Sequence, residues 1–370
     1  MEGMVKTRIT YSSLQKHYQG KNVFVTGHTG FKGSWFIKIL HDLGAFVRGY
    51  SLAPEDEFCL YSQMKGDELC DSVLSDIRDR YELQKALIDF KPDFVFHFAA
   101  QPLVRKSYLF PVDTFEVNSM GTLNLLESLR ALDMKCSIIL ITTDKVYLNK
   151  ELDYYYKETD SLGGYDPYSA SKACAELLID SYRNCFFNTK DYDSHLKGIA
   201  VARAGNVIGG GDWAKDRLIP DVVRSLQSDS EIVIRNQSSI RPWQHVIEPL
   251  FGYLELGVKL LIDPIQFGQA FNFGPNKFDN LTVEEVVTEA IKYWESGSYR
   301  IQQSIENYHE ASLLKLDISK ALLHLNWKPV FDSSTSIERT ISWYKKFYSG
   351  ISVLELMNSD IEFYLEKSNE

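Results

Sequence analysis

The sequence predicts an α/β protein with a doubly wound parallel sheet and a smaller, mixed α/β lobe towards its C-terminal end. Strand-like and helix-like segments alternate over roughly the first 210 residues, which is the order typical of parallel sheets. The strand-like segments are apolar on both faces, as strands covered by helices on both sides are. A glycine-rich turn joins the first strand to the first helix, and the 370 residues suffice for a large core.

The elements of the first half follow from composition and spacing. Residues 22–26 form a β-branched run that ends at a glycine, and residues 34–43 place their apolar side chains on one helical face. A break at Lys91-Pro92-Asp93 separates a helix over 81–90 from a buried strand over 94–100. The same criteria predict strands over 45–52, 137–147 and 198–208, and helices over 117–132 and 168–183.

The pattern becomes less regular after Gly209-Gly210-Gly211. Spacing there predicts helices over 218–226, 245–261, 283–294 and 335–348, and strands over 232–235 and 270–273. Residues 352–370 also have helical spacing and could pack on their own lobe or on a second subunit. We therefore divide the chain into residues 1–210 and 211–370, with some later strands or helices able to return to the first domain.

Composition excludes several classes of protein. With 44% hydrophobic and 24% charged residues the chain is not disordered, and a net charge of −10 argues against a general grip on nucleic acid. We find no apolar run near the roughly 20 residues that span a bilayer, and the polar N-terminus lacks a signal-peptide stretch. Five cysteines without metal-ligand spacing predict reduced thiols in the cytoplasm and no metal site.

Gly27, Gly30 and Gly33 lie between the first strand and the first helix. In this place the first glycine allows a tight turn, the second lets the backbone approach a pyrophosphate, and the third lets helix and strand pack closely. The helix N-terminus then presents N–H groups to the phosphates. The sequence therefore predicts a dinucleotide site in a Rossmann-type domain.

The residues alone do not choose between NAD and NADP. The glycine spacing is G-x-x-G-x-x-G, and the second strand ends in Gly49-Tyr50-Ser51-Leu52. This end has neither the acid that binds an adenosine ribose nor an arginine for a 2′-phosphate. Asp76 and Ile77 end the next short strand, where they could face the adenine ring or form a turn or helix cap.

Tyr168 and Lys172 are four residues apart on a predicted helix, so they lie on one face. A lysine ammonium near a phenol favours the phenolate, which can take a proton from an alcohol. Thr143, Asp144 and Lys145 end a predicted strand, and the carboxyl ends of such strands border the ligand crevice. We therefore expect these five residues to converge at one site.

Several long runs of the chain are specific enough to indicate a family. They are GHTGFKGSW, DIRD, AAQPLVRKSY, VNSMGT, ITTDKVY, GGYDPYSASK, RAGNVIGGGDWAKDRLIPD, IRPWQHVIEPL and HEASLLKLD. With these runs the chain resembles the extended short-chain dehydrogenase/reductases and, within that superfamily, the CDP-glucose 4,6-dehydratases. The likeness covers roughly residues 18–348.

The resemblance implies a lyase that uses NAD to convert CDP-glucose to its 4-keto-6-deoxy form, for deoxysugar and O-antigen biosynthesis. Residues 1–210 would then mainly bind NAD, and residues 211–370 would mainly bind the nucleotide sugar. Tyr168 would take the proton of the sugar 4-hydroxyl, Thr143 would hydrogen-bond the same oxygen, and Lys172 would depress the tyrosine pKa. Asp144 would protonate the leaving 6-hydroxyl.

The resemblance also implies binding residues. For the cofactor these are Gly27, Thr29, Gly30, Phe31, Lys32, Gly33, Asp76, Ile77, Ala99, Ala100, Gln101, Asn118, Thr142, Tyr168 and Lys172. For the nucleotide sugar these are Arg105, Asn206, Arg217, Arg241 and His309, where arginine suits the diphosphate. The nearby rings of Trp213 and Trp243 could cover a pyrimidine or pack in the core.

One departure from related enzymes concerns Lys145. In the dTDP-glucose dehydratases an Asp-Glu pair stands here and the glutamate takes the C5 proton, whereas this chain has Asp144-Lys145. A lysine can act as a base only when burial or cationic neighbours lower its pKa. The CDP-glucose type is similar in having lysine here, so we place Lys145 among the catalytic residues and leave the C5 base open.

Two other functions fit part of the pattern. A nucleotide-sugar 4-epimerase or reductase of the same superfamily shares the tyrosine and lysine but has no use for an acid at Asp144. A non-catalytic dinucleotide-binding protein would be expected to lose Tyr168 or Lys172, and both are present. The superfamily resemblance implies a homodimer through two helices per subunit, with a homotetramer as the alternative.

Overall fold

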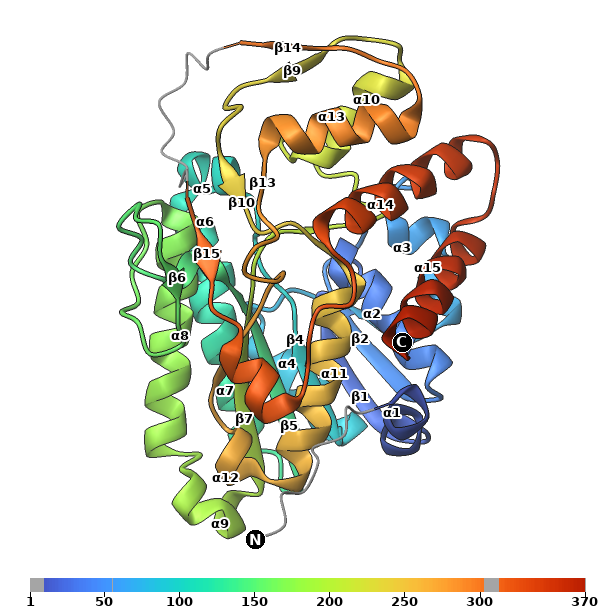
Figure 1. The fold of residues 1–370 in the computed structure, drawn as a ribbon. Coiled ribbons are helices and arrows are strands. Elements are labelled where there is room, and N and C mark those ends of the chain that lie inside the picture. Colours follow the sequence, from blue (N-terminus) through green and yellow to red (C-terminus); the bar gives the residue numbers. More distant parts are fainter. Residues whose placement is uncertain (1–9, 55, 303–312, 370) are drawn as a thin grey trace, which may run out of the picture.

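The computed structural model describes residues 10–54, 56–302 and 313–369. Within these residues, seven strands form one parallel sheet in the order β12-β7-β5-β4-β1-β2-β3. Helices cover both faces of the sheet, and a smaller lobe that carries α10, α13, β9 and β14 stands beyond one end of it (Figure 1). The structure confirms the predicted doubly wound α/β class.

The order of the strands reverses between β1 and β4. The sheet strands are β1 (Asn22–Thr26), β2 (Phe46–Ser51), β3 (Asp71–Leu74), β4 (Phe94–His97), β5 (Cys136–Thr143), β7 (Lys197–Ala204) and β12 (Ala270–Phe273). From β1 the chain first adds β2 and β3 on one side and then β4 and β5 on the other. In open α/β sheets ligands bind beyond the strand carboxyl ends at such a reversal.

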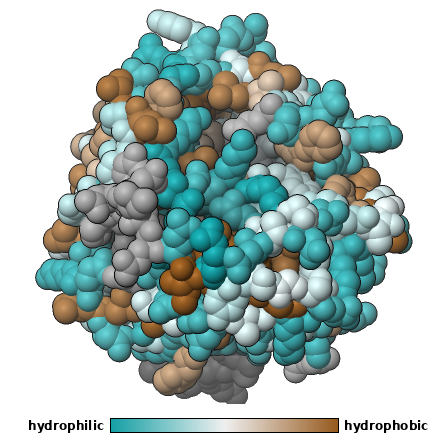
Figure 2. Space-filling view, turned by 90° about the horizontal axis from the view of Figure 1, so that it is seen from above, coloured by the Kyte–Doolittle hydropathy of each residue, from teal (hydrophilic) through white to brown (hydrophobic). Residues whose placement is uncertain are grey.

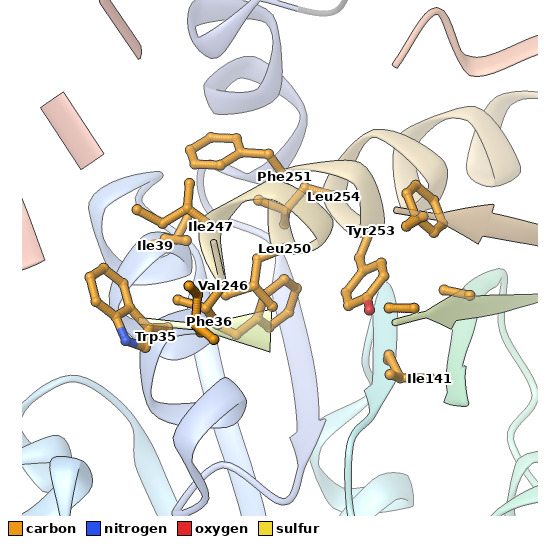
Figure 3. Packing of buried hydrophobic residues seen from close by; sticks show 14 of the residues in the cluster. Trp35, Phe36, Ile39, Ile141, Val246, Ile247, Leu250, Phe251, Tyr253 and Leu254 are labelled. Atoms are coloured by element: carbon orange, nitrogen blue, oxygen red, sulfur yellow. The ribbon is translucent and has the colours of Figure 1, made fainter. Parts of the chain in front are cut away.

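Alternate strand residues point to opposite faces, and both faces are buried in apolar cores. On one face the strands pack with α2 (Phe31–Asp42) and α11 (Ile247–Ile262); Figure 3 shows Trp35 and Phe36 of α2 near Leu250 of α11. The other face packs with α4 (Arg80–Phe90), α7 (Gly121–Arg130) and α8 (Pro167–Cys185). Each fully buried aliphatic or phenyl side chain contributes about 1.5–3 kcal/mol, which explains strands that are apolar throughout.

The second part of the chain contributes to both regions of the molecule. Helix α11 and strand β12 complete the main sheet layer, although they follow residue 210. The lobe elements are β9 (Ile232–Ile234), β10 (Ile240–Arg241), β13 (Leu281–Thr282), β14 (Tyr299–Ile301), α10 (Leu218–Gln227) and α13 (Val283–Trp294). Helices α14 (Ser333–Tyr348) and α15 (Val353–Ser368) then pack back towards α2 (Figure 1). The division at residue 210 stays a prediction.

Short elements connect these parts. They are α1 (Tyr11–Tyr18), α3 (Leu60–Gln63), η1 (Gly66–Glu68), α5 (Val104–Leu109), α6 (Pro111–Phe115), η2 (Glu116–Met120), η3 (Asp144–Val146), β6 (Tyr155–Tyr156), η4 (Thr189–Asp191), α9 (Tyr192–His195), β8 (Val207–Ile208), β11 (Gln244–His245), α12 (Pro264–Phe267), β15 (Lys315–Leu316) and η5 (Ala321–Leu325).

Several boundaries differ from the sequence prediction: the strand predicted over 198–208 is divided into β7 and β8, the strand over 94–100 ends at His97, and the helix over 34–43 begins at Phe31. The strand predicted over 137–147 ends at Thr143, where the chain turns into η3. The helix predicted over 245–261 begins at Ile247, because Gln244 and His245 pair with β8 as the strand β11. The helix predicted over 117–132 begins as the π-helical turn η2 and ends at Arg130. A change in backbone hydrogen bonding inside an apolar run does not alter the spacing of its apolar residues, so the sequence pattern does not reveal where such a change occurs.

Gly210 has a packing role. A Cβ on Gly210 would lie 1.9 Å from the Trp343 ring of α14, and its carbonyl accepts the Trp35 indole N–H at 3.0 Å. The glycine run after β8 thus lets α14 pack directly on the backbone near α2.

No helix in the described ranges is long and apolar enough to cross a membrane. All five cysteines lie in the described part of the chain and are free thiols. Figure 2 shows the end of the molecule that carries the smaller lobe, where hydrophobic residues are scattered among hydrophilic ones.

Candidate active site

The glycine loop follows β1 and leads into α2. Gly27 has φ +75°, and a Cβ there would lie 2.7 Å from the backbone N of Ala99. A Cβ on Gly33 would lie 2.1 Å from the carbonyl oxygen of Gly27, so both positions are restricted to glycine by the protein's own packing. A Cβ on Gly30 would meet only that carbonyl, at 3.4 Å, and Gly30 is exposed. The outer side of the loop therefore has room for an anion at the helix N-terminus.

The next two strand ends border the same loop. The hydroxyl of Thr29 contacts that of Ser51 at 2.8 Å and donates to the Leu52 carbonyl at 3.0 Å. Asp76 accepts Nε and Nη2 of Arg78 at 3.0 Å and 2.6 Å, and these hydrogen bonds hold the pKa of Asp76 below its usual value. Asp76 is therefore engaged with its own neighbour, and its predicted contact with an adenine ring stays a prediction.

The predicted strand-end residues form a buried turn after β5. Thr143 donates to Oδ1 of Asp144 at 2.9 Å, and Asp144 is 2% exposed. Burial raises the pKa of Asp144, although Lys145, the Thr143 hydrogen bond and Arg241 act against that rise. This carboxyl group therefore holds a proton more readily than an ordinary aspartate, as an acid catalyst requires.

Helix α8 brings Tyr168 and Lys172 to the same site. Burial raises the pKa of Tyr168 to about 12, while a hydrogen bond with Thr143 acts in the opposite direction. Burial lowers the pKa of Lys172 to about 8, and its Nζ donates to the Ile141 carbonyl at 3.2 Å. Lys145 lies over the ring of Tyr168, with Nζ 5.9 Å from its centroid. The five predicted catalytic residues thus meet at the carboxyl ends of the strands.

A directed chain of hydrogen bonds links β1 to α8 through His97. The Thr122 hydroxyl donates to the Asn118 carbonyl at 2.7 Å, so it accepts from Nε2 of His97 at 3.1 Å. Nδ1 of His97 then accepts from Thr26 at 2.7 Å. Burial and the charge of Lys172 lower the pKa of His97 to about 3, which agrees with this neutral tautomer. Asn118 in turn donates to Ser171 Oγ at 2.9 Å.

The remaining predicted cofactor residues lie around this chain. Asn118 Oδ1 accepts the backbone N–H of Gln101 at 2.8 Å, which fixes the segment after β4 that contains Ala99 and Ala100. Phe31 is half-buried and packs against the core at the first turn of α2. Their contacts with a cofactor stay predictions.

Basic residues predicted to bind ligands gather near the β5 turn. Burial, Arg217 and Lys172 lower the pKa of Lys32 to about 8, against the effect of Asp144, so Lys32 lies among these charges. Arg217 donates to Asp212 at 3.0 Å, and its charge also lowers the pKa of Tyr168.

The other predicted substrate residues are placed differently. Arg105 donates to Asp216 at 3.1 Å, which joins α5 to the segment before α10. Asn206 is half-buried between β7 and β8. Arg241 lies in β10, and its charge lowers the pKa of Asp144. His309 lies outside the described residues.

The two tryptophans near these residues are part of the core. Trp213 packs against Tyr344 and Phe347, and Trp243 is 4% exposed with its Nε1 donating to the Leu281 carbonyl at 3.1 Å. The structure therefore favours the packing role over the alternative of covering a pyrimidine.

The sequence analysis missed two charged residues next to the site. Glu176 and Arg203 form a buried ion pair, and Glu176 also accepts the hydroxyl of Thr142. The side chain of Thr142, which we expected to bind the cofactor, is therefore engaged with Glu176. Within residues 10–54, 56–302 and 313–369, no three His, Cys, Asp or Glu side chains are grouped to hold a metal ion.

Fold and site together define a class of enzyme. A glycine loop at the reversal of a parallel sheet, with a tyrosine and a lysine one helical turn apart at the strand ends, is the arrangement of the short-chain dehydrogenase/reductases. Residues 24–340 match the family model described as GDP-mannose 4,6 dehydratase. The chain belongs to this family of nucleotide-sugar dehydratases and epimerases.

Individual relatives agree with this assignment. The chain is 44% identical over 348 residues to the CDP-glucose 4,6-dehydratase of Salmonella typhimurium, covering 94% of this chain and 97% of the relative. Its fold is similar to that of an epimerase from Methanothermobacter thermautotrophicus, with a TM-score of 0.78 and 22% identity over 94% and 97% of the two chains. DesIV, a dTDP-glucose 4,6-dehydratase from Streptomyces venezuelae solved with NAD bound, has a TM-score of 0.75 and 22% identity over 90% and 99%.

Proposed function

We propose that the protein is an NAD-dependent CDP-glucose 4,6-dehydratase, a hydro-lyase that forms CDP-4-keto-6-deoxyglucose. The observation that carries this proposal is the turn Thr143-Asp144-Lys145, which brings a buried hydroxyl, a buried carboxyl group and the Lys145 side chain to Tyr168. The high identity to the Salmonella relative supports the same activity and the same nucleotide.

NAD fits the residues of the glycine loop. The open side of Gly30 and the N-terminus of α2 would hold the pyrophosphate, Asp76 and Ile77 would face the adenine, and Lys172 would hold the nicotinamide ribose. When bound, NAD⁺ supplies reversible hydride acceptance, so that oxidation at C4 and reduction at C6 balance without net use of cofactor.

Tyr168 would take the proton from the sugar O4, and Thr143 would hydrogen-bond the same oxygen. A buried phenol with a pKa of about 12 loses its proton only when neighbouring groups stabilise the phenolate. Thr143 and Arg217 both lower the pKa of Tyr168. Nζ of Lys145 lies 5.9 Å from the centroid of the same ring. The carboxyl groups of Asp144 and Asp166 act with burial to raise this pKa, so Thr143 and Arg217 oppose burial only in part.

Elimination would then use the turn after β5. A ketone at C4 acidifies the C5 proton, which would move to the neutral amine of Lys145 and return to C5 when C6 is reduced. The electron pair of the C5–H bond forms the C5–C6 double bond as the C6–O bond breaks. Asp144 gives its proton to the departing oxygen, which leaves as water. The raised pKa of Asp144 suits this role.

The arginines of the site would bind the CDP diphosphate. The charge of Arg217 lowers the pKa of Tyr168 and that of Arg241 lowers the pKa of Asp144, which supports a role for both beside the reacting groups. Arg105, Asn206 and His309 are proposed with them from the resemblance. An epimerase would use Tyr168 and Lys172 but has no step that needs a buried acid at Asp144, so no observation favours that alternative.

We further propose that two copies pair through α7 and α8. The adjacent elements α6, η2 and α8 carry exposed apolar side chains on Val112 (71%), Met120 (48%) and Leu177 (58%). A second copy would cover them. Light scattering should give the mass of a dimer, and a tetramer would call for a second interface. The free thiols support a cytoplasmic place of action.

The experiment that tests the activity is incubation with a panel of nucleotide-activated glucoses, with CDP-, dTDP-, GDP- and UDP-glucose compared. We expect CDP-glucose to lose one water without net reduction of NAD⁺, as measured by product mass and absorbance. Formation of a C4 epimer without loss of mass would contradict the proposal.

A further inference from the structure

A buried ion pair lies behind the Tyr168–Lys172 face of α8. Glu176, one helical turn beyond Lys172, is 2% exposed, and its partner Arg203 is 4% exposed. Arg203 donates from Nε and Nη2 to the Glu176 carboxylate at 2.9 Å and 2.5 Å. Thr142 donates to Oε1 of Glu176 at 2.6 Å. Three donors therefore hold this carboxylate in one orientation.

Arg203, the partner of Glu176, is itself held in place by the main sheet. Thr142 of β5 lies opposite Arg203 of β7 in the strand register, so both partners of Glu176 come from adjacent strand ends. Arg203 also donates to the Tyr147 hydroxyl at 2.9 Å and to the Glu158 carbonyl at 3.1 Å. The position of Glu176 is thus set by strands whose carboxyl ends form the site.

Among the charged groups of the site, Lys172 is the one nearest to Glu176 along α8. It is 5% exposed, and its Nζ donates a hydrogen bond to the Ile141 carbonyl at 3.2 Å. The charged or titratable neighbours from the packed elements are Lys32 of α2 and the neutral His97 of β4, besides Glu176. Lys32 is a cation and repels the Lys172 ammonium, and the neutral His97 carries no charge that could stabilise it. The negative charge that favours the protonated form of Lys172 therefore comes from Glu176.

We propose that Glu176, held by Arg203 and Thr142, is a positioning residue that keeps Lys172 protonated for the reaction. This inference rests on the proposed function, in which Lys172 acts as a cation beside Tyr168. If Glu176 were neutral, Arg203 and Lys172 would be two buried cations without that carboxylate. Arginine keeps its proton in proteins, so Lys172 would lose its proton first.

The first test is the pH dependence of turnover of CDP-glucose by the Glu176→Gln enzyme. Loss of the Lys172 proton should set the alkaline limb of the wild-type profile, because burial lowers the pKa of Lys172 to about 8. Without the Glu176 charge, we expect that limb to move down by about 1 pH unit or more, the usual effect of a close opposite charge. Activity at pH 6 should be reduced much less than activity at pH 8.

The second test observes Lys172 without substrate or cofactor. In enzyme labelled with ¹⁵N-lysine, the Lys172 Nζ signal can be assigned by its absence from Lys172→Arg. We expect its titration to move to lower pH in Glu176→Gln and to return towards wild type in Glu176→Asp, which restores the charge. An unchanged Nζ titration in Glu176→Gln overturns the inference, whatever the enzyme does to CDP-glucose.

Asp360→Asn is the matched control. It removes the carboxylate of another ion pair, between the buried Asp360 of α15 and the partly exposed Arg339 of α14. Its Lys172 titration and alkaline limb should stay as in wild type, even if stability falls. A similar shift in Asp360→Asn would mean that any loosened core moves Lys172, which overturns a specific role for Glu176.

Glu176→Gln leaves Arg203 buried without its carboxylate, which is costly. If that variant does not fold, the double variant Glu176→Gln with Arg203→Met removes both charges. We expect a shift in the same direction but smaller than in Glu176→Gln, because the carboxylate that favours protonated Lys172 is lost together with the buried cation that would compete with it. A wild-type titration in the folded double variant contradicts the proposal, whereas failure of wild-type enzyme to act on CDP-glucose contradicts only the proposed function.

Discussion

The Oδ2 atom of Asp360 lies 3.7 Å from Nε2 of His245, and both side chains are buried. Asp360 belongs to α15 and His245 ends β11, while Arg339 of α14 donates to Oδ1 of Asp360 at 2.7 Å. Burial raises the pKa of Asp360 to about 6 and lowers that of His245 to about 3. One interior cluster thus holds two groups whose pKa values are displaced in opposite directions.

These displacements predict opposing effects of pH on the free energy of unfolding. His245 binds its proton more weakly in the folded state, because its pKa is about 3 instead of 6.5, so acidification below pH 6.5 destabilises the fold. Asp360 binds its proton more tightly when folded, with a pKa of about 6 instead of 3.8, so acidification from pH 6 to 4 stabilises it. In wild type the two effects oppose each other between pH 4 and 6.

The variant Asp360→Asn removes the second effect only. We expect its free energy of unfolding, measured by urea denaturation, to fall more steeply than that of wild type as pH drops from 6 to 4. Parallel curves for the two proteins over this range would show that Asp360 does not titrate there.

Asp144→Asn separates elimination from oxidation. The amide keeps the size of the side chain but has no proton to transfer to the departing oxygen. We expect the variant to bind CDP-glucose and reduce bound NAD⁺, while product formation slows about 10²–10⁴-fold. Absorbance of bound NADH and product mass would be followed together; loss of water at the wild-type rate would exclude Asp144 as the acid.

Tyr168→Phe tests the oxidation itself. The ring that packs beneath Lys145 is kept, and only the hydroxyl that accepts the O4 proton is removed. Turnover should fall roughly 10²-fold or more, with no bound NADH formed. Circular dichroism would check the fold. Near-normal turnover by a folded variant would contradict the assignment of Tyr168 as the group that accepts the O4 proton.

Lys145→Gln tests the base at C5. The amide is polar but one bond shorter than the lysine and cannot take a proton, so we expect bound NAD⁺ to be reduced while exchange of the C5 proton with solvent slows about 10²-fold. Deuterium incorporation from D₂O at C5 measures this step. Unchanged incorporation would assign the C5 base to another group.

Two alanine substitutions in the glycine loop should have different consequences. In Gly33→Ala the new Cβ would lie 2.1 Å from the Gly27 carbonyl, so the loop must shift and stability should drop by about 1–3 kcal/mol. In Gly30→Ala the nearest atom is 3.4 Å away, so stability should change little while NAD⁺ affinity falls, because the methyl group occupies the pyrophosphate side. Thermal unfolding and NAD⁺ titration distinguish the two; equal affinity for Gly30→Ala would place the pyrophosphate elsewhere.

The main sheet and the reacting residues were predictable because their signals are local. Strands apolar on both faces, a glycine loop after β1, and Tyr168 and Lys172 one helical turn apart can all be recognised within short windows. Glu176 and Arg203 could not be paired in this way, since their contact depends on β5 and β7 being neighbours and on α8 lying over them. Their residue types alone fit an exposed helix face and an edge of a strand equally well.

Other differences come from burial that composition does not reveal. Helix α1 is mostly polar and shows no continuous apolar face in its sequence; Leu14 and Tyr18 are buried in the core, and Tyr11 packs against it. The prediction that Asp76 faces a ligand did not include Arg78, two residues further on, as its partner. Trp213 and Trp243 fit a ligand face by sequence, but α14 and β13 lie against them.

The edge strand β12 and the covering helix α11 have a consequence for synthesis of the protein. When residue 210 leaves the ribosome, six of the seven sheet strands exist, but β7 has no outer neighbour. The apolar face that includes Val25, Phe96 and Ile141 is also still without α11. Until residue 273 has emerged, this half of the nascent chain therefore exposes surface that a chaperone can bind, and its folding is completed from the C-terminal side.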